Sequence, residues 1–208
     1  MPLIKYNNNS LSSITALPAS IPTGKLKLIS SQTASNSASI SFTTGLNSTY
    51  KVYRFVFVNI HARTDRVEFE FQASTNGGSS YGVACTNTIV RAAHNESGSG
   101  QFGPEYDSQM DSAQSTSYVR LTSAGGGISN DSDHGEGGIL TLFNPASTVY
   151  VKHFIHDINY YNDDVYSQRG LHAGYFNTTS AINAFNFKMS SGNFDGTIYL
   201  YAIDNSWV

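Results

Sequence analysis

Charge is scarce in this sequence, and neither sign dominates. Charged residues make up 13% of the chain, and 12 Lys and Arg stand against 15 Asp and Glu, which gives a formal net charge of −3. Binding to a phosphate backbone depends on an excess of Lys and Arg. We therefore do not expect nucleic acid as a partner.

Cysteine and long apolar runs are scarce as well. Cys85 is the single cysteine, so no disulfide can form within the chain, and its setting in GVACTNT predicts a small buried hydrophobe. No stretch approaches the roughly 18 apolar residues of a membrane span, and the opening MPLIKYNNNS lacks the basic and apolar regions of a secretory signal. We expect a soluble protein that is made inside a cell and has no membrane partner.

Residues that favour helices are few, and residues that favour strands and turns are many. Ser, Thr, Asn and Gly dominate the polar set beside 13 Tyr and 12 Phe, a mixture typical of strands joined by polar turns. About ten runs have strand character, with no helical crossover between them. The sequence predicts an all-β fold: a jelly-roll-like antiparallel two-sheet sandwich forming one domain over residues 25–208, with an N-terminal arm over residues 1–24.

The strongest pattern lies in Tyr50–Ala73. The run Tyr50–Ile60 carries apolar or aromatic residues at both odd and even positions, which predicts a central strand covered on both faces. In the next run two faces alternate, with Val67, Phe69, Phe71 and Ala73 on one and Glu68, Glu70 and Gln72 on the other. The first face should meet a core and the second face water. We expect the two runs to pair as an antiparallel hairpin.

Turn residues and a long polar segment follow. Asn76-Gly77-Gly78 can supply the positive φ angles of a tight turn, so Tyr81–Val90 is expected to return as the next paired strand. From residue 91 to residue 135 the periodicity fades into a Gly-, Ser- and Asp-rich excursion. We expect a long loop there, crossed by one short strand at Tyr118–Thr122, and loops of this length are often functional or interfacial.

The N-terminal arm differs from the rest of the chain. Pro and a high content of Asn and Ser prevent a self-supporting element, yet the segment contains several apolar side chains. These candidate interface residues are Leu3, Ile4, Leu11, Ile14 and Leu17. Two interpretations stay open: a tail that packs on its own domain or is left disordered, or an arm that docks on a neighbouring subunit.

No pattern of catalytic residues has comparable strength. The sequence lacks a nucleophile motif with a placed base and lacks a zinc-protease motif, so we expect no enzyme, no cofactor and no metal. The densest group of possible ligands consists of Asp131, Asp133, His134 and Glu136. Its spacing is not that of an EF-hand, and we expect a solvated acidic loop. His153 and His156 are three residues apart on one predicted strand, so they should point to opposite faces.

A tyrosine-rich segment is the remaining candidate site. Tyr160, Tyr161 and Tyr166 are expected to cluster in a loop with the polar residues 162–164. Stacked aromatics beside amide and carboxylate groups suit a sugar, and tyrosine is equally enriched at protein interfaces. The sequence leaves both interpretations open.

Several phrases of the sequence carry a resemblance. They are the opening MPLIK, then LISSQTASNSASISFTTGLNSTY, FEFQASTNGGSSY, GGILTLFNP and the closing GTIYLYAI. Together they resemble short structural proteins encoded by tailed bacteriophages, especially those of marine cyanobacteria, over most of residues 26–84 and 136–203. The resemblance implies a virion component that is made in the host cytoplasm.

We therefore expect a non-enzymatic structural protein of a phage particle. The leading hypothesis is a decoration or cement protein on the head that bridges neighbouring subunits, is homo-oligomeric and contacts the major capsid protein or tail proteins. The alternative is a receptor-binding or fibre-associated module that recognises host-surface glycan.

Overall fold

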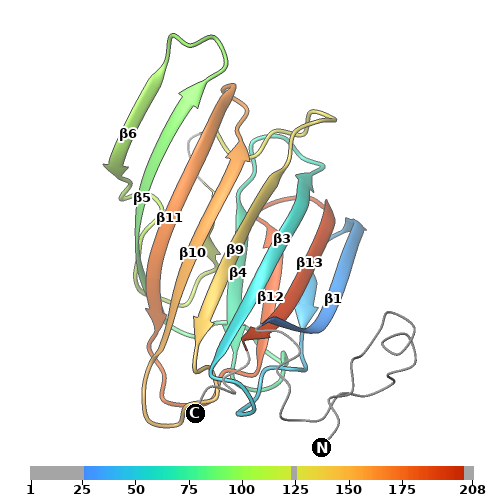
Figure 1. The fold of residues 1–208 in the computed structure, drawn as a ribbon, viewed down its shortest axis with the longest axis vertical. Coiled ribbons are helices and arrows are strands. Elements are labelled where there is room, and N and C mark those ends of the chain that lie inside the picture. The colour runs from blue at the N-terminus through green and yellow to red at the C-terminus, as the bar shows by residue number, and fades with distance from the viewer. Residues whose placement is uncertain (1–25, 123–125, 204–208) are drawn as a thin grey trace, which may run out of the picture.

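The computed structural model describes residues 26–122 and 126–203, and these residues form thirteen strands and no helix (Figure 1). The strands make a nine-stranded and a four-stranded sheet, and every pairing is antiparallel. The predicted all-β class and the two antiparallel sheets are confirmed. The predicted arm lies outside the described residues.

The large sheet lies in front of the small sheet in Figure 1. Its spatial order is β1 (Leu26–Ser37), β13 (Phe194–Ile203), β3 (Val52–Ala62), β9 (Glu136–Phe143), β10 (Lys152–Tyr161), β11 (Tyr166–Phe176), β5 (Cys85–Asn95) and β6 (Gln101–Tyr106), with β7 (Ser112–Ser115) also on β5. The order in the small sheet is β2 (Ile40–Phe42), β12 (Ala184–Met189), β4 (Phe69–Ser74) and β8 (Val119–Arg120).

The predicted hairpin over Tyr50–Ala73 is wrong, because β3 and β4 belong to different sheets. The connection over residues 63–68 can extend about 20 Å, which exceeds the roughly 10 Å between packed sheets. The chain uses this length to cross from one layer to the other. The central position of β3, between β13 and β9, is confirmed.

Phenylalanine fills the space between the two sheets. The ring centroids of Phe55 and Phe187 lie 5.0 Å apart, and those of Phe71 and Phe154 lie 5.4 Å apart, both edge to face. This geometry is the one that aromatic quadrupoles favour. The predicted core positions Phe69, Phe71 and Ala73 are confirmed, since all three side chains are fully buried.

The other face of β4 does not meet water as predicted. Glu70 and Gln72 are buried, and Gln72 Nε2 donates to the carbonyls of Thr116 and Ser117 at 3.1 and 2.7 Å. The segment between β7 and β8 therefore covers this side of the small sheet. Glu68, which precedes β4 near the start of the run, is half-buried.

The polar stretch after Ser31 continues β1, an edge strand whose Ser and Thr side chains face solvent. Two further expectations need correction. The turn at Gly77 and Gly78 has the expected positive φ angles of 71° and 88°, but it leads to β5 in the other sheet. The excursion over residues 91–135 contains the end of β5 and all of β6, β7 and β8. The short strand expected at Tyr118–Thr122 is confirmed as β8.

Candidate functional site

The side of the large sheet that faces away from the small sheet is unusually apolar. Side chains alternate along each strand, so every second residue of six neighbouring strands contributes to this surface. Its apolar members, which we call the outer apolar face, are Val52, Val56, Val58, Val90, Ile139, Phe143, Ile155, Leu171, Tyr175, Tyr199 and Tyr201. Ile155 is 53% exposed, Leu171 43% and Val90 41%.

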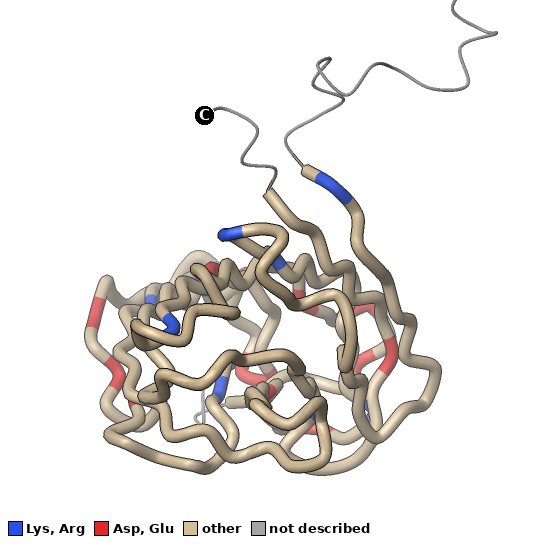
Figure 2. Tube along the Cα trace, turned by 90° about the horizontal axis from the view of Figure 1, so that it is seen from below, with Lys and Arg blue, Asp and Glu red and all other residues tan. Residues whose placement is uncertain are grey.

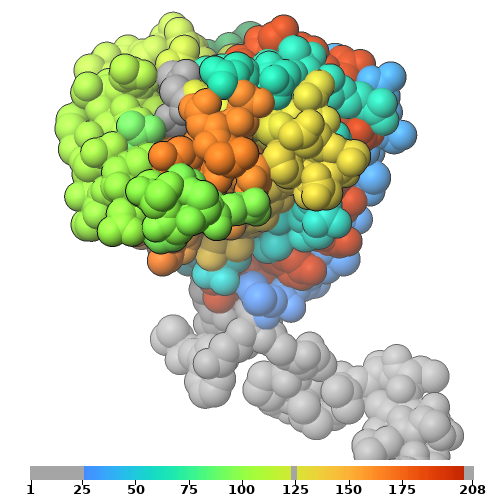
Figure 3. Space-filling view, turned by 90° about the horizontal axis from the view of Figure 1, so that it is seen from above, coloured from blue at the N-terminus to red at the C-terminus, as the bar shows by residue number. Residues whose placement is uncertain are grey.

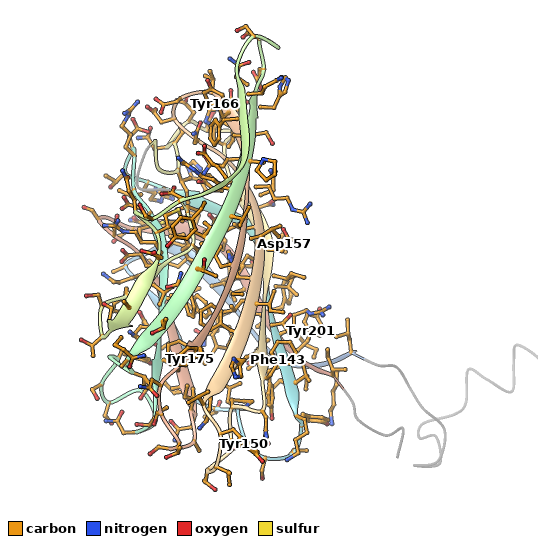
Figure 4. The ribbon with its side chains drawn as sticks, turned by 90° about the vertical axis from the view of Figure 1, so that its left-hand side faces the viewer. Phe143, Tyr150, Asp157, Tyr166, Tyr175 and Tyr201 are labelled. Carbon is orange, nitrogen blue, oxygen red and sulfur yellow. The ribbon has the colours of Figure 1, made fainter. Side chains whose placement is uncertain are left out.

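The strand register brings these side chains into rows that cross the sheet. One row runs from β13 to β5 through Tyr199, Val56, Ile139, Asp157, Leu171 and Val90. Figure 4 shows Phe143, Asp157, Tyr175 and Tyr201 on the large sheet, while Tyr150 lies at one end of the molecule. The face is thus continuous across strands that are far apart in sequence.

The prediction that both faces of β3 are covered is wrong for the described residues. Tyr53, Phe55 and Phe57 are buried on the inner side, whereas Val56 is half-buried and Val58 is 39% exposed on the outer side. The residues on both sides are apolar as the sequence indicates, but only the inner side has a second protein layer over it.

A shallow groove of about 440 Å³ hollows the outer apolar face across β9, β10, β11 and β5. Phe143, His153, Ile155 and Tyr175 contribute to its walls, and Ala173 lies between them. The short side chain of Ala173 among larger ones leaves the hollow. A flat partner surface would leave this space unfilled.

Charges on the outer face are few, in keeping with the sparse charges of the whole chain (Figure 2). Asp157 and Arg169 form a bidentate pair, with the Arg169 Nε and Nη2 donors at 2.9 and 2.7 Å. The bonds from Arg169 hold the pKa of Asp157 below its usual value. Arg54 donates to Thr141 Oγ1 at 3.3 Å. The face therefore carries little net charge.

The three candidate tyrosines are separated by the structure. Tyr160 is 1% exposed and lies in the core as part of β10, so its predicted place in a loop cluster is wrong. The alternation of β10 turns it inward with Phe154 and Ile158. Tyr161 instead packs against His134 with the rings tilted by 39° and their centroids 3.8 Å apart, and Tyr166 packs against Phe102, with ring centroids 5.8 Å apart.

These contacts lie at the end of the molecule seen in Figure 3, where the β10–β11 turn sits between the β5–β6 hairpin and the loop before β9. Asp163 and Asp164 in that turn are paired with Arg66 at 2.5 and 2.8 Å. Their carboxylates, expected as sugar partners, are thus engaged within the protein. Sequence reasoning missed Arg66, because nothing in the pattern links it to a turn about a hundred residues later.

The acidic loop is split between two environments. Asp131 and Asp133 are exposed, and His134 lies 3.7 and 3.8 Å from their carboxylates. Glu136 begins β9 and is buried, and among the described residues no group forms a hydrogen bond with its carboxyl oxygens. Burial raises the pKa of Glu136 well above its usual value. Within residues 26–122 and 126–203, no three metal-binding side chains gather in one place.

The two histidines of β10 point to opposite faces, as predicted. His153 is exposed, whereas His156 is fully buried. His156 faces His172 on β11, with ring centroids 5.0 Å apart. Burial lowers the pKa of His172 to about 4 and lowers the pKa of His156 well below its usual value. No local pattern in the sequence indicates this pair, because it depends on the register between β10 and β11.

A polar pocket of about 440 Å³ lies on the other side of the molecule, over β12, β4 and β8. Lys188 Nζ lies 3.6 Å from Glu70 and 4.5 Å from the centre of the Tyr118 ring. Arg120 also lines the pocket and donates to the carbonyl of Gln109 at 3.3 Å. Burial raises the pKa of the Glu70 carboxyl. The pocket thus combines both signs of charge with an aromatic side chain.

The interface residues expected in the arm, Leu3, Ile4, Leu11, Ile14 and Leu17, lie outside the described residues. Comparison with protein-family models, with curated proteins and with solved structures gave no match. Among the residues that the structure describes, none form a helix that could cross a membrane.

Proposed function

We propose that this protein is a non-enzymatic structural subunit of a larger protein assembly. The observation that carries this proposal is the outer apolar face. Monomers rarely expose a contiguous apolar surface of more than a few hundred Å². Side chains such as Ile155 and Leu171 stand in rows on a rigid sheet, which suits a permanent contact with another protein surface.

The strand order supports a jelly-roll-like arrangement of the sandwich, which is part of the proposal. The order β1-β13-β3-β9 in one layer faces β2-β12-β4-β8 in the other. The chain passes between layers at β1–β2, β2–β3, β3–β4, β4–β5, β7–β8, β8–β9, β11–β12 and β12–β13. In this interpretation β5, β6, β7, β10 and β11 are additions that widen one sheet. The widened part holds the groove.

The assembly is proposed to be the particle of a tailed bacteriophage, because of the resemblance described above. The favoured role is a decoration or cement protein on the head that reinforces the shell by bridging neighbouring subunits. The partners would be the major capsid protein or tail proteins, and the arm residues Leu3, Ile4, Leu11, Ile14 and Leu17 would contact a neighbour. The site of action is then the virion.

Quantitative protein staining of purified particles tests this role. A cement protein should be present in a copy number that follows the capsid lattice, on the order of hundreds per particle. A tail component should be present in a small number set by the symmetry of the tail. Absence of the protein from purified particles would refute the virion assignment altogether.

The polar pocket favours a second candidate function, a module that binds host-surface glycan. Tyr118 offers an aromatic ring, while Glu70, Arg120 and Lys188 offer directional hydrogen bonds. Binding to a panel of acidic and neutral glycans, compared between the native protein and an Arg120→Ala variant, tests this role. No binding by the native protein, or equal binding by the variant, would count against it.

A further inference from the structure

We propose that the outer apolar face binds a second copy of this chain in a face-to-face, two-fold contact. The inference rests on the proposed function, because it names the partner of the surface that carries it. Three properties of the face point to a second copy: its charge, its size and the positions that a two-fold axis would bring together.

The charge of the face suits contact with itself. The Asp157–Arg169 pair neutralises both of its members, which leaves Arg54 as the main uncompensated charge on the central strands. A partner chosen by charge would require a net sign on this surface. A nearly neutral face can meet its own copy without bringing like charges together.

The size of the face matches a standard interface. Six neighbouring strands, β13, β3, β9, β10, β11 and β5, carry it. With about 4.8 Å between strands and about 3.3 Å of rise over the residues from Val52 to Val58, the plane measures roughly 600 Å². Side-chain relief brings the accessible area close to the roughly 800 Å² that each partner contributes to a specific contact.

Consider a two-fold axis that is parallel to the strands and lies between the two facing sheets, over the boundary between β9 and β10. This axis gives complementary contacts. Such an axis places β3 of one copy over β11 of the other, and β13 over β5. In the observed register, Val56 then faces Leu171 of the second copy and Tyr199 faces Val90. Arg54 faces Ala173, so the two Arg54 side chains stay apart. Sheets packed in this way interdigitate their side chains, as in a sandwich.

The groove fits this arrangement. The same axis places Phe143 over His153 of the second copy and Thr141 over Ile155. The hollow between Phe143, Ile155 and Tyr175 is therefore covered by side chains of similar size from the other copy. The second copy would also supply a layer over the apolar outer side of β3, which no described residues of the same chain cover.

The test is the mass in solution of the full chain and of two matched variants, measured by light scattering and by analytical ultracentrifugation. Ile155→Glu introduces a charge at the centre of the face. Val149→Glu makes the same kind of change at an exposed apolar residue of the β9–β10 connection, off the face. Both residues are more than half exposed, and circular dichroism checks that both variants fold.

We expect the native protein and Val149→Glu to form dimers or closed assemblies built from them. Ile155→Glu should raise the dissociation constant of the dimer roughly thirtyfold or more. The reason is that each dimer would bury two new carboxylates, one from each copy. A native protein that is monomeric at about 100 μM, or equal behaviour of the two variants, would overturn the proposal.

A third chain that begins at Gly24 tests the arm as the occupant. If only this shortened chain associates, the arm covers the face and the proposal is wrong.

The outcome is distinguishable from that of the proposed function. If the protein is a dimer in solution but is absent from purified particles, the virion role is refuted and the two-fold contact is supported. A monomer that is present on particles does the reverse, and it assigns the outer apolar face to a different protein.

Discussion

The ring of Phe57 on β3 meets the ring of Phe69 on β4 edge to face, with centroids 5.3 Å apart. These two residues are close in sequence but belong to opposite layers of the sandwich. Their contact therefore spans the core between the two sheets and is not a contact between paired strands. It also explains why the connection over residues 63–68 must be long enough to leave one sheet and enter the other.

Replacing Phe57 with Ala should lower the free energy of unfolding by about 3–5 kcal/mol, because Phe57 contacts the rings of Phe69 and Phe187 inside the core. Tyr150→Ala is the matched control, since Tyr150 is 70% exposed and lies off the sheets. It should cost less than about 0.5 kcal/mol. Urea unfolding followed by fluorescence measures both values. A similar loss in the two variants would mean that Phe57 does not carry the core contact described here.

The sequence predicts which strands exist better than it predicts which strands pair. Alternation identified the buried side of β4 correctly, because burial depends on local pattern. One of the two partners of β4 is β12, more than a hundred residues away, and no local pattern specifies such a pairing. The same limit explains why β5, after a correctly predicted turn, lies on β11 instead of β4.

The candidate sites show the same limit at the level of side chains. Tyr160, Tyr161 and Tyr166 are neighbours in sequence, but a strand turns adjacent residues to opposite sides, and a register must be known to say which side is buried. The roles of Arg66 and His172 depend on partners that are distant in sequence or set by strand register: Arg66 forms an ion pair with Asp163, and His172 contacts the ring of His156. The apolar outer side of β3 was visible in the sequence, but its exposure within one chain was not.

Cys85 should resist modification in the folded protein. Its thiol is fully buried, and burial raises its pKa to about 12, so the reactive thiolate is almost absent at neutral pH. Labelling by a chromogenic disulfide reagent at pH 8 should be slow and limited by opening of the structure. The same reagent in urea should react completely within minutes. Fast stoichiometric labelling without denaturant would show that the end of β5 is open to solvent.

Stability should fall as the pH decreases from about 6.5 to about 4. The pKa of His172 is about 4 in the folded protein and about 6.5 in the unfolded chain. Because the unfolded state binds the proton first, the full stability is present above pH 6.5 and is lost as the pH falls toward 4. The loss from His172 alone is at most about 3 kcal/mol over this window, and His156 acts in the same direction.

Urea unfolding at several pH values between 4 and 7.5 measures this dependence. A His172→Leu variant removes one titrating group and places an uncharged side chain at the same position. Its free energy of unfolding should depend less steeply on pH than that of the native protein. His94→Leu is the control, since His94 is exposed on β5 and should leave the slope unchanged. Identical slopes in the native protein and in His172→Leu would contradict the assignment.

Glu136 should have the opposite pH dependence, and removing its charge should stabilise the protein at alkaline pH. Its carboxyl oxygens are buried without a hydrogen-bond partner in the part of the chain that the structure describes, and burial raises its pKa well above the usual value. The folded state therefore keeps a proton that the unfolded state releases above about pH 4.5, so this group lowers stability as the pH rises.

Glu136→Gln keeps the shape of the side chain and removes its titration. The variant should unfold at a higher urea concentration than the native protein at pH 8, and the difference should vanish near pH 4. A variant that is less stable than the native protein at pH 8 would mean that the Glu136 carboxylate has a stabilising partner in the folded state.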